Sequence, residues 1–193
     1  ALTGCTFSAN SADEAGGGIY FENSKFFIAN SVTEFSDIQG EGNWYYGYYD
    51  GDSAFPYSNN DFAQFPNYGI TEHGGFPEHW YIDDSLYWTA LWENGGHTNA
   101  AVDNSGGILD EEHWAVRRWV SGIEGQVRIA GNLAKIHGGY SGDGIMGYIL
   151  VDGDEVWSQY IAGYDTVGVN YSVNVAVNIV SLIDFAIAPN GNS

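Results

Sequence analysis

From residue 114 to residue 188 the chain alternates between short β-forming runs and glycine turns, and this pattern constrains its fold most. Asp152-Gly153 separates two apolar runs, which is a strong hairpin signal because glycine adopts positive φ without a Cβ clash. Residues 169–177 alternate with a period of two, which predicts one buried and one exposed face. About six such strands predict an all-β fold, an antiparallel β-sandwich or jelly roll. The expected strands cover residues 116–120, 127–133, 145–151, 156–161, 169–177 and 180–187.

The charge composition of the chain restricts the partners that we expect it to bind. The 193 residues carry a net charge of −20, from 25 acidic and five basic side chains. Such a chain repels nucleic acid and anionic lipid, so neither is an expected partner. No stretch approaches the roughly 18 apolar residues that a membrane-spanning helix needs, so membrane insertion is not expected. A single cysteine and a composition rich in Tyr, Trp, Gly and Asn and poor in Lys are typical of extracellular or cell-surface proteins of bacteria.

The N-terminal segment contains an internal repeat. Residues 6–11 (TFSANS) recur as residues 26–31 (FFIANS), and Gly16-Gly17-Gly18 lies between them. This string resembles the coils of right-handed parallel β-helices, in which each repeat relies on its neighbours for burial. We therefore divide the chain into an arm, residues 1–35, and a sandwich, residues 36–193. Either the arm strands join the sandwich sheets, or they are the end of a β-helix, or they form an arm that pairs with another chain. Folding back on its own chain would exclude pairing with another chain.

Aromatic side chains in the less regular middle of the chain are candidates for sugar binding. Residues 53–75 are rich in Asn, Pro and Gly and are expected to form one long ordered loop. A pyranose stacks its apolar face on an aromatic ring, while neighbouring polar groups bind its hydroxyls. The alternative is that the rings fill the core, as we expect for Trp119 and Trp157. The candidates are Trp44, Tyr46, Tyr48, Trp80, Trp88 and Trp92.

Calcium is the expected cofactor, because hard cations take carboxylate oxygens from irregular loops and would offset the negative charge. No spacing matches an EF-hand, and the alternative is a solvated acidic surface. Two groups of carboxylates are candidates. The first contains Asp37, Glu41, Asp50 and Asp52, and the second contains Asp103, Asp110 and Glu111.

Catalysis is not expected. Asp83-Asp84 and Glu111-Glu112-His113 contain groups used in acid–base chemistry, but 25 acidic residues produce such pairs by chance. The sequence has no nucleophile elbow, zincin motif or P-loop. Arg117, Arg118 and Arg128 are expected to pair with carboxylates.

Several motifs resemble a bacterial extracellular module of the carbohydrate-binding jelly-roll type. The resemblance covers roughly residues 36–190 and implies a polysaccharide-binding domain with no shared catalytic residues. That module continues into one more strand after the segment matched by residues 184–187, which implies an open sheet edge here. The matching segments are 44–51 (WYYGYYDG), 115–119 (AVRRW), 125–131 (GQVRIAG), 142–145 (GDGI), 149–157 (ILVDGDEVW) and 184–187 (DFAI).

Two functions are consistent with these features. The first is a secreted, non-catalytic β-sandwich module that binds polysaccharide through loop aromatics and is stabilised by calcium. The second is a structural subunit that polymerises with other copies of itself, its N-terminal arm completing the open sheet edge of a neighbour.

Overall fold

The structure is a computed structural model that describes residues 5–8, 18–21, 27–50, 60–71, 77–83, 89–100, 112–136 and 144–190. Its elements are β1 (Cys5–Ser8), β2 (Gly18–Phe21), β3 (Phe27–Asn30), the short 3-10 helix η1 (Glu41–Asn43), β4 (Trp44–Asp50), β5 (Phe62–Gln64), β6 (Asn67–Gly69), β7 (His79–Tyr81), β8 (Ala90–Trp92), β9 (Gly95–His97), β10 (His113–Val120), β11 (Gly125–Lys135), β12 (Ile145–Val151), β13 (Asp154–Ile161), β14 (Val169–Val177) and β15 (Leu182–Pro189). No helix in these ranges is long and apolar enough to cross a bilayer.

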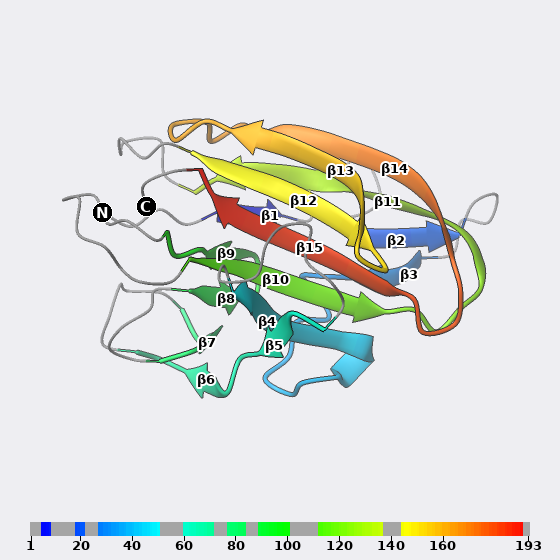
Figure 1. Cartoon of the computed structure of the whole chain (residues 1–193), viewed down its shortest axis with the longest axis horizontal. Helices are drawn as coiled ribbons and strands as arrows, with labels where there is room; N and C mark the ends of the chain where they lie inside the picture. Colours follow the sequence, from blue (N-terminus) through cyan, green and yellow to red (C-terminus); the bar gives the residue numbers. More distant parts are fainter. Residues whose placement is uncertain are drawn as a thin grey trace.

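The strands form two antiparallel sheets that face each other (Figure 1). The six-stranded sheet has the order β13-β12-β15-β10-β4-β5. The nine-stranded sheet has the order β3-β2-β11-β1-β9-β8-β7-β6, and β14 pairs with the other side of β11. The predicted antiparallel β-sandwich is therefore confirmed.

The strands of the second half agree closely with the alternating sequence pattern. The predicted hairpin joins β12 and β13, and both of its turn residues have positive φ, 54° at Asp152 and 92° at Gly153. The Asp152 carboxylate also accepts bonds from the Leu182 amide and the Ser181 hydroxyl, each at 2.8 Å. The turn is thus fixed to the strand beside it.

The middle of the chain differs from the sequence-based expectation. Residues 60–71 contain the strands β5 and β6, so the prediction of one continuous loop over 53–75 is wrong for this part. Each strand has three residues, too few to show an alternating pattern.

The strands of the N-terminal arm join the sandwich. β2 and β1 pair end to end along one side of β11, at Val127–Ala130 and Asn132–Lys135, and β1 also pairs with β9. β2 and β3 pair antiparallel, whereas successive coils of a parallel β-helix pair parallel. Of our interpretations of the arm, the structure agrees with the one in which its strands join the sandwich sheets. β15, the last strand that the structure describes, lies between β12 and β10 and is therefore not an edge strand.

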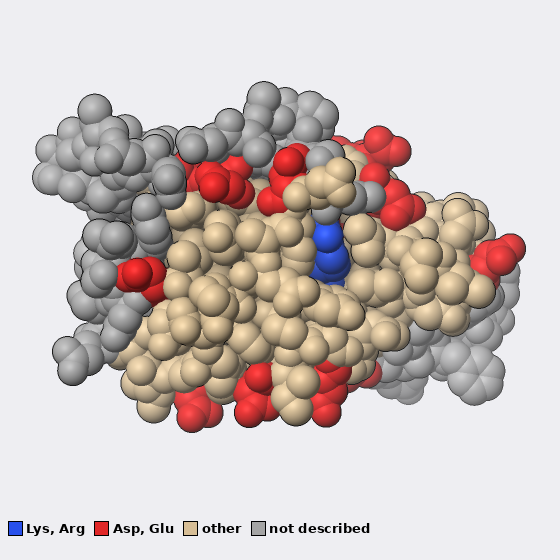
Figure 2. Space-filling view, turned by 60° about the horizontal axis from the view of Figure 1, so that its bottom comes forward, with Lys and Arg blue, Asp and Glu red and all other residues tan. Residues whose placement is uncertain are grey.

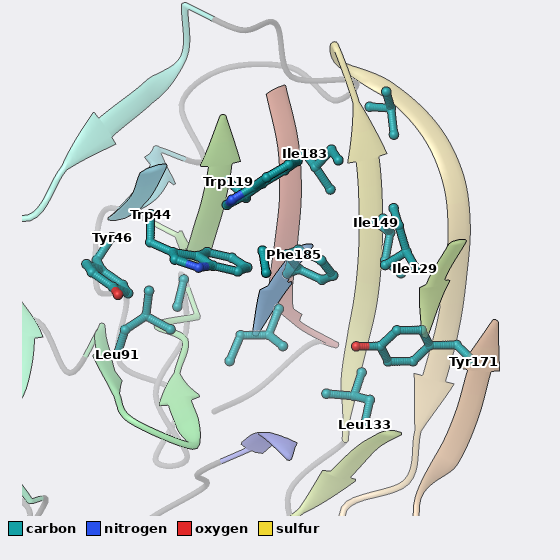
Figure 3. Packing of buried hydrophobic residues seen from close by; sticks show 14 of the residues in the cluster. Trp44, Tyr46, Leu91, Trp119, Ile129, Leu133, Ile149, Tyr171, Ile183 and Phe185 are labelled. Carbon is teal, nitrogen blue, oxygen red and sulfur yellow. The ribbon is translucent and has the colours of Figure 1, made fainter. Parts of the chain in front are cut away.

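Side chains between the two sheets form the main core (Figure 3). The ring of Trp44 lies 6.0 Å from that of Phe185, and Trp119 is 2% exposed, as predicted for a core residue. From the other sheet, Ile129 and Leu133 of β11 are fully buried. This packing leaves one face of each sheet pointing away from the core.

Arg117 is buried inside this core with no exposed surface. Its guanidinium donates hydrogen bonds to the carbonyl oxygens of Ser31, Glu93 (3.2 Å) and Trp92 (2.8 Å). We expected a carboxylate partner, and that prediction is wrong, because backbone carbonyls take this place. Burial lowers the pKa of Arg117 to about 10. The side chain joins the end of β3 and the β8–β9 turn to β10.

Candidate functional site

Four of the six aromatic sugar-binding candidates are core residues. Trp44, Tyr46, Trp80 and Trp92 are at most 6% exposed, and the Tyr46 and Trp80 rings stack on each other at 5.7 Å. The prediction that these four present open stacking surfaces is therefore wrong. Trp44, Tyr46 and Trp80 belong to the cluster between the sheets, and Trp92 is buried outside that cluster. An aromatic-rich sequence does not reveal this burial.

The other two sugar-binding candidates are Tyr48 and Trp88. The half-buried ring of Tyr48 packs against Phe65 at 5.6 Å and His113 at 5.1 Å, beside the main core. Trp88 lies outside the described residues.

The calcium candidates do not come together where the structure describes them. Glu41 precedes β4 and Asp50 ends it, so the length of the strand, about 20 Å, separates them. The Glu41 carboxylate accepts a bond from the Ser36 hydroxyl, and Asp37 is exposed. Among the described residues, no three His, Cys, Asp or Glu side chains group as a metal site would require. Asp52, Asp103, Asp110 and Glu111 lie outside those residues, so calcium binding there stays a prediction.

Of the acidic residues considered for acid–base chemistry, Glu112 has a structural hydrogen-bond partner. Glu112 accepts a 2.6 Å hydrogen bond from the Trp114 indole, and His113 is 2% exposed. Asp83 is half-buried, while Asp84 and Glu111 lie outside the described residues.

The outer face of the six-stranded sheet carries a second cluster of buried residues, separate from the main core. It arises because residues of opposite parity on each strand point away from the other sheet. On β10, for example, Ala115 and Trp119 enter the core, while Trp114 and Val116 belong to this outer cluster. The cluster contains Tyr49, Trp114, Val116, Leu150, Ala186 and Ala188, with Phe62, Met146 and Tyr148 packed against it.

Trp114 and Tyr148 form a parallel aromatic pair on this face. Their ring centroids are 4.8 Å apart and the planes differ by 11°. The rings come from β10 and β12, which flank β15, where Ala186 lies in register with Tyr148. The alanines of β15 leave the space in which the two larger side chains meet.

Two carboxylates lie beside this aromatic pair. Glu112 binds the Trp114 indole, and Glu155 accepts a 2.6 Å hydrogen bond from the Ser158 hydroxyl. Burial raises the pKa of Tyr148, and the charges of Glu155 and Glu112 raise it further. We call Glu112, Trp114, Tyr148, Glu155 and Ser158 the aromatic-acidic patch. Because Trp114 is 6% exposed, Tyr148 supplies the ring surface of this patch, while Ser158 and Glu155 supply the hydroxyl and carboxylate groups that a sugar ring also requires.

An ion pair lies on the same face of the sheet. Arg118 donates two 2.7 Å hydrogen bonds to Asp184, which lies directly opposite it on β15, and the Tyr49 hydroxyl also binds this carboxylate. The Phe62 ring covers the guanidinium, with its centroid 4.0 Å from Cζ. The predicted pairing with a carboxylate is confirmed at Arg118, and the pair is bidentate. Because Asp184 is 1% exposed and has three donors, its role is to hold strands together.

On the face of the molecule shown in Figure 2, acidic side chains lie around the margins and a small basic area is set in a hollow. No protein-family model, curated protein or solved structure matches this chain. What this chain binds therefore has to be inferred from the chemistry of the described residues.

Proposed function

We propose that this chain is a secreted, non-catalytic β-sandwich module that binds polysaccharide at the aromatic-acidic patch. The observation that carries the proposal is the parallel pair of Trp114 and Tyr148 with two carboxylates beside it. A sugar ring would stack on Tyr148, which is half-buried, and Glu155 and Ser158 would bind its hydroxyls. This moves the proposed binding site from the loop aromatics to a sheet face.

Affinity electrophoresis in gels containing a soluble neutral polysaccharide (β-glucan, xylan or galactomannan) tests the proposal. We expect at least one of them to retard the protein and Tyr148→Ala to weaken the interaction about three- to tenfold, the range for one aromatic contact. Tyr164→Ala is the matched control, because Tyr164 is 74% exposed and lies in the β13–β14 connection. Migration unchanged by every polysaccharide, or equal retardation of Tyr148→Ala and the parent, would contradict the proposal.

A Trp88→Ala variant in the same gels distinguishes a binding site on the sheet face from one in the loops. Loss of retardation in that variant alone would return the site to the loop aromatics. Polymerisation through the N-terminal arm receives no support from the described strands, because β1 and β2 pair with β11 of their own chain.

A further inference from the structure

The edges of the two sheets differ in how they are protected from other strands. Within the described part of the chain, the edge strands are β5 and β13 in one sheet and β3, β6 and β14 in the other. β3, β5 and β6 have at most four residues each. β13 begins with Asp154 and Glu155 and pairs with β12 through an irregular register. Short length, charge and irregular pairing are devices that discourage edge-to-edge pairing.

β14 has none of these devices. Its nine residues, VNYSVNVAV, include no charged residue, proline or glycine. Its register with β11 is continuous from Leu133–Val169 to Gly125–Val177. Tyr171, Val175 and Val177 are buried in the core, while the residues that alternate with them are exposed. The described structure gives β14 a partner strand on one side and none on the other.

We propose that β14 pairs antiparallel with β14 of a second copy across a two-fold axis. Two copies that each carry a net charge of −20 repel one another, so a contact between them requires a surface without acidic groups. β14 is such a surface, and its register partners on β11, which include Arg128 opposite Asn174, carry no carboxylate either. The exposed Asn170, Ser172 and Asn174 supply amide and hydroxyl groups for cross-strand pairs. Figure 1 shows β13 and β14 together along one long side of the sandwich, and β14 flanks β11 on the side opposite β1 and β2.

This pairing uses the same patch on both copies, so it closes at two chains. It therefore differs from polymerisation through the arm, which would continue. It also rests on other residues than polysaccharide binding, because the aromatic-acidic patch lies on the outer face of the other sheet.

Sedimentation equilibrium of the whole chain tests the proposal over concentrations from about 1 µM to about 1 mM, where weak complexes form. We expect the mass to rise from one chain to two and to stop there. A mass of one chain throughout, or growth beyond two chains, would overturn the proposal.

A pair of charge-matched variants locates the contact. Ser172→Lys/Asn174→Lys places like charges across the proposed strand pair and should weaken the dimer at least about tenfold. The control, Thr33→Lys/Gln64→Lys, adds the same two charges at exposed positions elsewhere and should dimerise at least as strongly as the parent, because repulsion falls. Equal dimerisation of both variants would overturn the proposal. Circular dichroism checks folding, and single Ser172→Lys replaces the double variant if that one unfolds.

Discussion

Val180 holds a backbone conformation that β-branched residues rarely adopt. Its φ is 68°, in the turn that joins β14 to β15, and its side chain is 69% exposed. The Val180 amide donates a 2.7 Å hydrogen bond to the Ser121 carbonyl, which holds the turn against the β10–β11 connection. The left-handed region costs a β-branched residue roughly 1–2 kcal/mol. The turn therefore keeps its shape at the expense of stability.

Replacing Val180 with glycine should stabilise the protein. Glycine removes the Cβ clash, and its greater freedom in the unfolded chain cancels part of the gain, which leaves about 0.5–1 kcal/mol. Thermal denaturation should show a midpoint about 1–4 °C higher. The neighbouring Ile179 is 59% exposed and is not among the positive-φ residues, so Ile179→Gly should lower the midpoint instead. A decrease for both variants would mean that Val180 is not strained.

At the scale of single elements, β5 depends on one glycine of the neighbouring strand. A Cβ at Gly47 of β4 would lie 2.1 Å from the Ala63 carbonyl oxygen and 2.6 Å from Cζ of Phe62. The Phe62 ring occupies this space and covers the Arg118 guanidinium. Gly47 thus allows a three-residue strand to close over the ion pair.

We expect Gly47→Ala to displace β5 and to lower the free energy of unfolding by about 1–3 kcal/mol, the usual cost of overpacking. Urea denaturation measures this change. Gly122→Ala is the control, because a Cβ there would meet only Asn43 Nδ2 at 3.7 Å, and its effect should stay within about 0.5 kcal/mol. Similar effects of the two substitutions would show that β5 does not pack tightly on Gly47.

The sequence predicted long strands well and short strands poorly. β12, β13 and β14 each span seven or more residues, and their alternation and the Asp152-Gly153 turn are local signals. β5 and β6 depend on pairing with distant strands, which three residues cannot encode. For the same reason the arm was ambiguous, since only the pairing of β1 and β2 with β11 places it.

The candidate site was missed for a related reason. Ile145, Ile149 and Val151 alternate with Met146 and Tyr148 on β12, so the sequence does place Tyr148 opposite the core residues. Its partner Trp114 comes from a strand that is not adjacent to β12, and this contact depends on the position of β15. The sequence signal that pointed to this site was Tyr148, an aromatic residue on the face of its strand opposite the core residues.

At the scale of the whole molecule, buried tyrosines set an upper pH limit on stability. Burial raises the pKa of Tyr46, Tyr49 and Tyr171 above the ordinary value, and Asp184 adds to the shift at Tyr49. A raised pKa means that the folded state holds the phenol proton more tightly than the unfolded state. The stabilisation is complete below the unfolded pKa of about 10 and is lost above it. Arg117, whose pKa is lowered to about 10, acts in the opposite direction over the same range but is a single group.

The urea midpoint should therefore be steady near pH 8 and fall as the pH passes about 10. Tyr171→Phe should reduce the slope of this decline, because one buried phenol no longer ionises on unfolding. Tyr164→Phe, at a site that is 74% exposed, should leave the slope unchanged. A midpoint that stays level to about pH 11 would contradict the assignment.

The buried guanidinium of Arg117 also bears on how the sandwich opens. Its carbonyl acceptors come from the end of β3 and from the β8–β9 turn, which are distant in sequence. If either segment detached alone, a charge would remain in the core with too few acceptors, which is costly. Amide hydrogens of the β8–β9 turn and of the residues after β3 should therefore exchange with solvent as one cooperative unit. A single cation thus makes separate parts of the chain open together.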